Sequence, residues 1–414
     1  MSDKYALLPL FDTVENISET LDPHFDCPFW KSDYRSGIAF LTSYNGSEAT
    51  FNAYRRELER LLHWSWKIAQ KSVCDLRRTD IETYLQFCQK PPDSWISLKK
   101  VPRFVVKDGL RVPNAEWRPF VVTISKSAAR AGETLKIKNY QLSETALKEI
   151  FAILSSFYNF LIQEEVTEIN PVAQIRQKSK FLRKKQGKPK IRRLSELQWE
   201  YVIETAEILA RNNPEKHERT LFILSALFLM YLRISELAAS DRWTPHMNDL
   251  QKDHDGNWWF TVVGKGNKER EIAVSDAMLK SLKRWRTHLN LTPLPSPADK
   301  SYLIPKTKGI GAISNTSFIR KIVQTCFDAT IERLNQDGFH EDAAVLSQTT
   351  VHWLRHTGIS EDVKHRPREH VRDDAGHSSG AITDKYIDIE RRDRHATAKN
   401  KLLKQEEVII PDDQ

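Results

Sequence analysis

The feature that most constrains this 414-residue chain is a strongly basic run between two apolar-rich halves. Between Arg176 and Arg193, ten residues are lysine or arginine and none is acidic. Like charges at this density repel one another, so the run is predicted to stay extended rather than fold into a core. The chain is also too long for one ordinary core. We therefore predict a domain at 31–175, a basic linker at 176–193 and a second domain at 194–400.

The sign of the charge suits a polyanionic partner. The whole chain has a formal net charge of +8 and a pI of about 9.1. A solvated linker is the simpler interpretation and stays open. The position of the run between two domains favours a linker that also lies along DNA phosphates. The residues that would make these contacts are Arg176, Lys178, Lys180, Arg183, Lys184 and Lys185.

The first half shows a helical period that is interrupted once. Phe51, Tyr54, Leu58 and Leu61 recur at three- and four-residue steps, which predicts an amphipathic helix. The stretch from about 93 to 142 instead carries prolines and short β-prone runs, and is predicted to be an inserted hairpin or excursion. Residues 1–30 show no clear period and are expected to form an N-terminal arm. At the other end, 401–414 is expected to be a C-terminal tail.

The second half combines helices with one hairpin. Ser195-Glu196-Leu197-Gln198 is a capping-box start, and a long buried helix is predicted to run through Leu221 to Leu237. Strands are predicted at 258–263 and 271–274, with a glycine-rich turn between them. The fold class expected for the whole chain is therefore mainly α with a small β-sheet.

The composition excludes several classes of protein. Four cysteines lie far apart with no CxxC pair, which argues against a disulfide framework or a thiolate zinc site. The N-terminus lacks the basic start and apolar run of a secretory signal. The longest apolar stretch, Leu221 to Leu232, is too short to span a bilayer. We therefore expect a cytoplasmic protein with reduced thiols.

Four short patterns in the second half combine residue types that carry chemistry. Taken singly, each has an ordinary explanation. Arg233 could pair with Glu236, Lys265 could be an exposed hairpin lysine, and Tyr386 could be a packing residue. The four patterns are YLRISEL at 231–237, GKGNKER at 264–270, HWLRH at 352–356, and GHSSGAITDKYI at 376–387.

The spacing of two histidines raises the question of a metal. His352 and His356 are four residues apart, as in zinc-binding helices. No glutamate follows His352, and no third ligand is evident, so the pattern is not HExxH. We predict no metal and no cofactor.

In this order, the four patterns resemble the tyrosine recombinases, also called phage-integrase-type recombinases. That family carries Arg, Lys, His-x-x-Arg, His and Tyr in the same sequence order. The resemblance covers roughly 194–390 well and extends more loosely to 34–173. It implies a helical core-binding domain followed by a catalytic domain built around an α/β-hairpin arrangement. It also implies that the catalytic residues are Arg233, Lys265, His352, Arg355, His377 and Tyr386.

The resemblance assigns a role to each residue type. Two arginines would offset the charge of a DNA phosphate, and His377 would donate a further hydrogen bond to it. Tyr386 would attack and form a covalent 3′-phosphotyrosyl link. His352 would accept the phenolic proton, and Lys265 would protonate the departing 5′ oxygen. Glu236 and His356 are expected to support the site without taking a chemical step.

The chain departs from the family pattern at two places near these residues. Tyr231 stands where glycine is common, and Asp374-Ala375 replaces the apolar pair usual before Gly-His. The insertion at 93–142 is also outside the usual pattern. We expect none of these departures to prevent catalysis.

The partners implied are double-stranded DNA, three further copies in a homo-tetramer, and accessory DNA-bending or directionality proteins. The biological outcome would be integration, excision or resolution of a mobile element. Two alternatives stay open. One is a catalytically silent DNA-binding accessory protein or regulator with the same fold, and the other is a relaxing activity like that of type IB topoisomerases.

Overall fold

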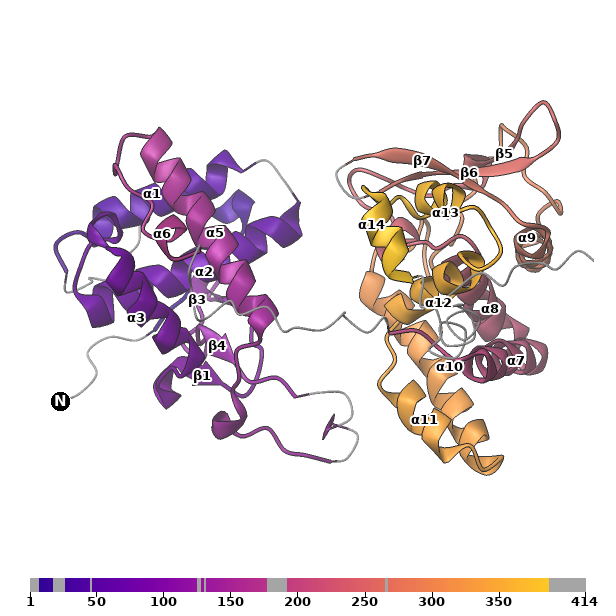
Figure 1. The fold of residues 1–414 in the computed structure, drawn as a ribbon, viewed down its shortest axis with the longest axis horizontal. Helices are drawn as coiled ribbons and strands as arrows, with labels where there is room; N and C mark the ends of the chain where they lie inside the picture. Colours follow the sequence, from indigo (N-terminus) through magenta and orange to yellow (C-terminus); the bar gives the residue numbers. More distant parts are fainter. Residues whose placement is uncertain are drawn as a thin grey trace, which may run out of the picture. The chain divides into compact units, whose positions relative to one another are not determined.

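The structure is a computed structural model that describes residues 7–17, 27–44, 47–124, 128–129, 132–176, 192–264 and 267–386. The chain divides into two compact units, Met1–Gly187 and Lys188–Gln414, each with a hydrophobic core of its own (Figure 1). Helices dominate both units, and the sheets are small. The fold class predicted from the sequence is confirmed.

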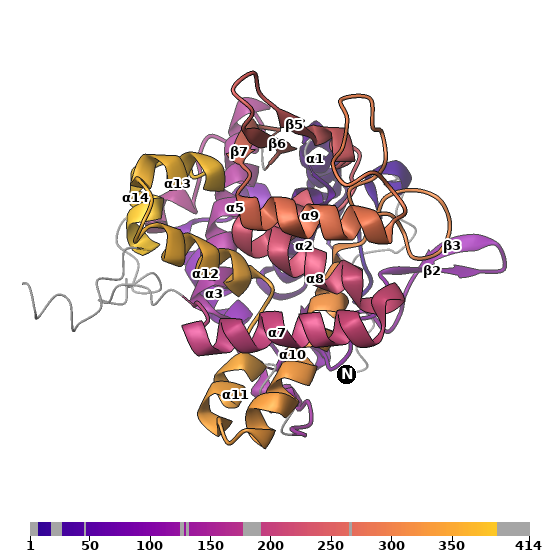
Figure 2. The same cartoon turned by 90° about the vertical axis from the view of Figure 1, so that its right-hand side faces the viewer.

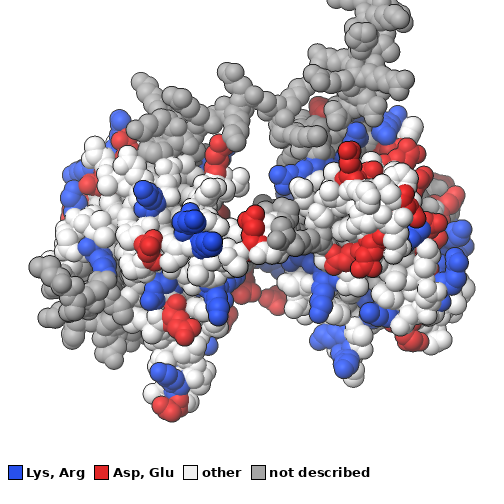
Figure 3. Space-filling model, turned by 90° about the horizontal axis from the view of Figure 1, so that it is seen from below, with Lys and Arg blue, Asp and Glu red and all other residues white. Residues whose placement is uncertain are grey.

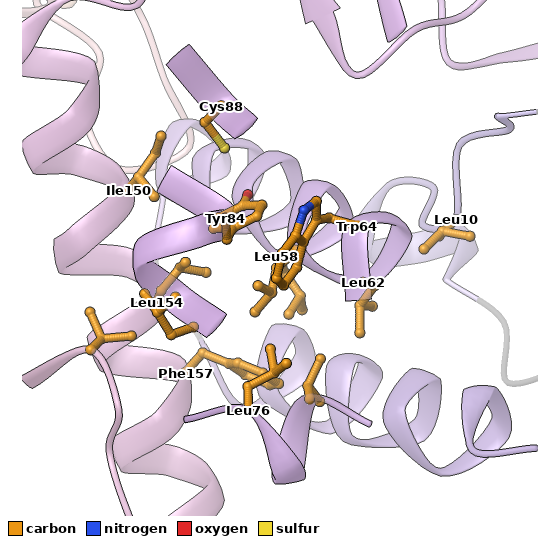
Figure 4. Packing of buried hydrophobic residues seen from close by; sticks show 14 of the residues in the cluster. Leu10, Leu58, Leu62, Trp64, Leu76, Tyr84, Cys88, Ile150, Leu154 and Phe157 are labelled. Atoms are coloured by element: carbon orange, nitrogen blue, oxygen red, sulfur yellow. The ribbon is translucent and has the colours of Figure 1, made fainter. Parts of the chain in front are cut away.

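The first unit is a group of helices around one core. Its main helix, α5, is long and apolar enough to cross a membrane by length and composition alone, yet seven of its side chains are buried in this core. Figure 4 shows Ile150, Leu154 and Phe157 of α5 facing leucines and aromatic rings from other helices. The helices are α1 (Trp30–Ser43), α2 (Glu48–Trp64), α3 (Arg78–Gln89), α5 (Glu144–Gln163) and α6 (Ala173–Arg176).

The described part of the N-terminal segment is not a free arm. Leu10 and Phe11 are buried in the core of the first unit, and Figure 4 shows Leu10 near Leu62 of α2. The carbonyl of Leu10 accepts a hydrogen bond from the Tyr34 hydroxyl at 3.2 Å. The buried carboxylate of Glu59 accepts from the Leu10 and Phe11 amides. The sequence-based picture of an arm at 1–30 is therefore corrected for residues 7–17, because polar groups on α2 satisfy their backbone.

The segment 93–142 contains a protruding hairpin. Strands β2 (Phe104–Lys107) and β3 (Leu110–Pro113) pair antiparallel around a tight turn, and Figure 2 shows them extending away from the helices. Two further short strands, β1 (Ile96–Ser97) and β4 (Phe120–Val121), pair in parallel. The β-prone run at 104–106 forms one strand of the hairpin, whereas the run at 120–122 supplies β4, which pairs with β1.

The second unit is built around one central helix. That helix, α8, has ten buried residues and is packed by α7, α9, α10 and α12 (Figure 2). The predicted capping box at Ser195 is present, with the Ser195 hydroxyl accepting from the Gln198 amide and the Gln198 side chain accepting in return. The helices are α7 (Glu196–Asn212), α8 (Pro214–Leu229), α9 (Asp276–His288), α10 (Thr316–Gln336), α11 (His340–Ser347), α12 (His352–Asp362), α13 (Arg368–Ala375) and α14 (Gly380–Thr383).

One antiparallel sheet covers part of this helical unit. Its strands are β5 (Leu250–Lys252), β6 (Trp258–Val263) and β7 (Glu269–Ala273), in the order β5-β6-β7. The β6–β7 register pairs Phe260 with Ile272, so the sheet buries one apolar face. Strand β7 also contacts α13 (Figure 1). The predicted hairpin is confirmed, and it lies next to the helix that leads to His377.

The helix predicted to reach Leu237 ends earlier. Helix α8 stops at Leu229, and Tyr231 has φ +49, in the left-handed region that a right-handed helix cannot contain. A short 3-10 turn, η7 (Ile234–Glu236), follows, with Arg233 as its N-cap residue. The apolar run continues beyond the helix because Met230, Tyr231 and Leu232 are buried without being helical. Arg233 therefore lies on an irregular segment rather than on a helix.

The described surface mixes both signs of charge. On the face drawn in Figure 3, lysine and arginine side chains are interspersed with acidic ones on each unit. Such a mixture gives no continuous basic stripe among the described residues of that face.

The crossing of α8 and α12 gives a test of the fold. A methyl group at Gly358 of α12 would lie 2.1 Å from the Phe228 carbonyl oxygen of α8, which is closer than atoms can approach. We expect Gly358→Ala to lower the free energy of unfolding by about 1–3 kcal/mol, measured by urea denaturation. Gly380→Ala is the matched control because nothing lies within 4 Å of its added methyl group. Equal stability of the two variants would contradict this packing.

Candidate active site

Four segments of the sequence meet in the second unit. They are the segment after α8, helix α12, the connection from α13 to α14, and the 3-10 turn η9 (Asp384–Tyr386), which follows α14 (Figure 1). Helix α12 contacts α8, α13 and η9, so it is the element that links the other three. Five of the six residues predicted to be catalytic lie on these segments: Arg233, His352, Arg355, His377 and Tyr386.

Glu236 holds two arginines through one buried carboxylate. Its side chain is only about 2% exposed. It accepts from the Arg233 amide at 2.7 Å and from Arg233 Nη1 at 2.9 Å. Both terminal nitrogens of Arg270, from β7, donate to the same carboxylate at 2.9 Å. A planar guanidinium matches a carboxylate in this two-point geometry, so Glu236 fixes the direction of both side chains.

The C-terminal end of α13 binds three arginines through successive carbonyl groups at 374–376. The Asp374 carbonyl accepts from Arg270 Nε at 3.0 Å. The next carbonyl, that of Ala375, accepts from Arg355 Nη2 at 2.5 Å. The Gly376 carbonyl accepts from Arg233 Nη2 at 3.3 Å. The last carbonyls of a helix have no partner within the helix and carry partial negative charge, so they suit cationic donors.

Gly376 is required by this arrangement. It has φ +62 and caps α13 in the left-handed conformation. A methyl group at this position would lie 2.8 Å from Cδ of Arg270 and 3.0 Å from its Nε. The glycine in the Gly-His pattern therefore both ends α13 and leaves room for the arginine behind it.

The Tyr386 hydroxyl meets a histidine other than the one we predicted. It lies 2.5 Å from Nδ1 of His356, in a hydrogen bond whose donor depends on the histidine tautomer. His352 does not touch the hydroxyl among the described contacts, but its ring lies 4.2 Å from that of His356. The His377 ring stacks on the Tyr386 ring at 5.6 Å. The residue expected only to support the site is thus the one in contact with the phenol.

Tyr386 is largely shielded from solvent. It is 7% exposed, and its ring belongs to a small apolar cluster with Tyr231, Ile359, Val371 and Ala375. Burial raises the pKa of the Tyr386 phenol, and the nearby Arg355 and Arg233 oppose that rise. The phenol is therefore protonated at neutral pH.

The site carries excess positive charge. Burial, with contributions from Arg355 and Arg233, lowers the pKa of His377 to about 4. Burial also lowers the pKa of His356 to about 4, helped by His352 and Arg355. Burial and the neighbouring Arg233 lower the pKa of Arg355 to about 10. Burial is the largest cause of each of these shifts, and the neighbouring cations add to it, so the site would gain from a bound anion such as a phosphate.

Glu236 is the main negative group among the described side chains of the site. Burial alone would raise the pKa of its carboxyl, but hydrogen bonds from Arg270 and the charges of Arg270 and Arg233 outweigh this and lower it. The carboxylate therefore stays ionised and offsets part of the arginine charge. No group of three or more potential metal ligands occurs among the residues that the structure describes.

Several predicted residues lie outside the described part of the chain. Lys265, the candidate acid on the hairpin turn, is among them. Arg176 ends α6, but its side chain is not described. The remaining linker residues and the C-terminal tail at 401–414 are also outside: Lys178, Lys180, Arg183, Lys184 and Lys185. Their roles stay predictions.

Arg270 was missed by sequence reasoning although it is one of the most connected side chains of the site. It alternates with acidic residues in a short strand, a pattern that usually marks an exposed edge. Its side chain is about 11% exposed and binds Glu236, 34 residues earlier in the chain. The only sequence signal was its position at the end of the GKGNKER pattern.

The lowered histidine pKa values predict a pH dependence of stability. His356 and His377 have pKa values of about 4 in the folded chain, below the value of about 6.5 expected after unfolding. The unfolded chain therefore binds more protons between about pH 4 and 6.5, so lowering the pH through this window favours unfolding. We expect the melting temperature to fall in this window, and to fall less in His356→Gln. The control is His254→Gln, at a surface position, and identical slopes for all three proteins would contradict the burial of His356.

The family model described as the phage integrase family matches residues 192–392. The tyrosine recombinase XerD of Rickettsia bellii (strain RML369-C) is 25% identical over 179 residues, which is 43% of this chain and 55% of that protein. The tyrosine recombinase XerC of Staphylococcus epidermidis (strain ATCC 35984) is 29% identical over 172 residues, which is 41% of this chain and 50% of that protein. The chain thus spans about half the length of these relatives.

A solved structure shares the fold over more of the chain. The XerH site-specific recombinase, bound to palindromic difH substrate in a post-cleavage complex, aligns with a TM-score of 0.55 at 13% identity and covers 89% of both chains. At this identity the likeness shows the fold alone. The match of the family model includes every segment that forms the site. The chain therefore carries, at residues 192–392, a domain of the phage integrase family.

Proposed function

We propose that this chain is a site-specific DNA recombinase that cuts and rejoins DNA through a covalent 3′-phosphotyrosyl intermediate on Tyr386. The observation that carries the proposal is the convergence of Arg233 and Arg355 with His356, His377 and Tyr386 in a phage integrase domain. A protein that only binds DNA has no need for a phenol held against a histidine beside two arginines.

The arginines would act on the charge of the scissile phosphate. A phosphodiester anion repels a nucleophile until its nonbridging oxygens are neutralised. Arg233 and Arg355 are already directed by fixed carbonyl groups, so little reorganisation is needed when a phosphate arrives. His377 would add a hydrogen bond once the phosphate raises its pKa.

The covalent step is a transesterification. The Tyr386 oxygen attacks phosphorus, the bond from phosphorus to the 5′ oxygen breaks, and the phenolic proton passes to a histidine. His356 is in contact with the hydroxyl, and His352 packs against His356, so we propose that the proton leaves through His356. The assignment of this role to His352, which the sequence resemblance implies, stays a prediction. Lys265 would protonate the 5′ oxygen, and attack by a 5′ hydroxyl would reverse the step.

The shielded tyrosine implies a resting state. Tyr386 is 7% exposed and its hydroxyl is engaged by His356, so attack on DNA requires η9 to shift. A phosphate bound to the arginines would raise the pKa of His356, which makes its ring a stronger acceptor of the phenolic proton. We propose that DNA binding activates the nucleophile in this way.

The partners follow from the same proposal. Double-stranded DNA would be the substrate, and strand exchange between two sites calls for four copies of the chain. The named relatives are tyrosine recombinases, and the XerH structure holds a DNA substrate. We place the protein at the nucleoid, working with accessory DNA-bending or directionality proteins, and infer a role in integration, excision or resolution of a mobile element.

A covalent-adduct assay tests the proposal. Tyr386→Phe should bind DNA without cutting it, so this variant can select a binding duplex from a random-sequence library. We expect the wild-type chain to form a DNA-linked band, resolved on a denaturing gel, when incubated with nicked forms of the selected duplex. Tyr386→Phe should form none, because it lacks the attacking oxygen.

Tyr201→Phe is the matched control, since it removes a tyrosine hydroxyl on α7 that is bonded to Asp337. It should form the adduct at the wild-type rate. Tight binding of the selected duplex without any adduct in the wild type would favour the catalytically silent accessory protein. Efficient relaxation of a supercoiled plasmid without exchange between two sites would favour the topoisomerase-like activity.

A further inference from the structure

Tyr231 occupies a backbone conformation that tyrosine rarely adopts. Its φ is +49, in the left-handed region that favours glycine, and its side chain is buried. Its carbonyl oxygen accepts a hydrogen bond from Nη1 of Arg355. Arg355 is therefore held on one side by this carbonyl and on the other by the Ala375 carbonyl. The direction of its guanidinium depends on where these two backbone segments lie.

The Tyr231 hydroxyl is tied to the residues that follow α12. It bonds to the carboxylate of Asp362. Nη1 of Arg366 donates to the same hydroxyl at 3.0 Å and to Asp362 at 3.1 Å. Burial and the Asp362 carboxylate raise the pKa of the Tyr231 phenol, so it stays protonated and donates to Asp362. The Tyr231 side chain thus anchors the unusual turn after α8.

Arg366 continues this connection to the end of α13. Its Nη2 donates to Oδ2 of Asp374 at 2.6 Å. Asp374 is 5% exposed, and its other oxygen accepts from the Ala273 amide of β7 at 3.3 Å. A buried carboxylate is unfavourable unless it is paired and hydrogen-bonded, and Arg366 supplies the pair. A chain of contacts therefore runs from Tyr231 through Arg366 to Asp374.

Tyr231 and Asp374, at the two ends of this series of contacts, are also the two departures from the family pattern near the site. By the resemblance to the tyrosine recombinases, glycine is common at the place of Tyr231 and an apolar residue is usual at that of Asp374. Each would be unfavourable alone, since a tyrosine strains the left-handed turn and an aspartate buries a charge. Arg366 bonds to both Tyr231 and Asp374, so one arginine offsets the unfavourable free energy of both departures. The two ends also flank the two carbonyls that hold Arg355.

We propose that Tyr231, Arg366 and Asp374 are positioning residues that fix the Arg355 guanidinium for the scissile phosphate. They take no chemical step and touch no DNA. They set the distance between the Tyr231 and Ala375 carbonyls, and through it the direction of Arg355. This inference rests on the proposed function, because it assigns Arg355 to the phosphate.

The test compares variants that keep the shape of each side chain. Tyr231→Phe removes only the hydroxyl, and Asp374→Asn keeps an oxygen for the Ala273 amide. In single-turnover cleavage of the selected nicked duplex, we expect each variant to be slower by about 10- to 100-fold, as for a misplaced catalytic group. The double variant should be no slower than the slower single variant, because both break one connection. Affinity for the duplex should be unchanged.

A duplex with a methylphosphonate at the scissile position separates positioning from general structure. The neutral phosphorus group no longer needs Arg355 to offset charge. We expect the rate defects of Tyr231→Phe and Asp374→Asn to shrink on this duplex, as that of Arg355→Ala should. Asp299→Asn is the matched control, since Asp299 pairs with the buried Arg286 at a distance of 2.7 Å. Neither residue belongs to the site. It should lower the melting temperature and leave the ratio of rates on the two duplexes unchanged.

The outcomes keep the two proposals apart. The positioning role alone would be overturned if the wild type forms the adduct and both Tyr231→Phe and Asp374→Asn cleave at the wild-type rate. Equal defects on the phosphate and methylphosphonate duplexes would also overturn it, because the loss would then be structural. No adduct in the wild type would overturn the proposed function, and the positioning role with it.

Discussion

The C-terminal end of α13 is the constraint on which the site depends. The three carbonyl groups of residues 374–376 each accept a hydrogen bond from a different arginine: Arg270, Arg355 and Arg233. Guanidinium groups this close repel one another, and the repulsion is offset by the negative end of the helix and by the buried Glu236 carboxylate. The arginines are therefore assembled before any phosphate arrives. Burial, helped by the remaining positive charge, keeps the neighbouring histidines neutral, and a bound phosphate would offset the contribution of the charge.

The fold was predictable where local chemistry decides it. The Ser195 capping box and strand β6 have the expected residues, and β7 begins two residues earlier than predicted and ends one earlier, because caps and alternating strands depend on near neighbours. The end of α8 was not predictable, since buried residues continue past Leu229 and only tertiary contacts hold Tyr231 in a left-handed conformation. The packing of residues 7–17 was missed for a similar reason. The amides of Leu10 and Phe11 donate to the carboxylate of Glu59 on α2, almost 50 residues away in the chain.

The candidate site shows the same division. The order of the motifs predicted one site for residues that also interact in the structure, such as Arg355 and Tyr386. It did not show which histidine meets the phenol. His352 and His356 are one turn apart on the same face of α12, and only the position of η9 selects His356. Arg270 was invisible for another reason, because its partners come from segments distant in the sequence.

The most direct test of this account is a structure of the Tyr386→Phe protein bound to its selected duplex. We predict that Arg233 and Arg355 both lie about 3 Å from nonbridging oxygens of a single phosphate, with their bonds to the end of α13 retained. The aromatic ring at position 386 should face the same phosphorus. Two guanidinium groups on different phosphates, or an α13 end that no longer holds them, would contradict the claim that this helix end assembles the site.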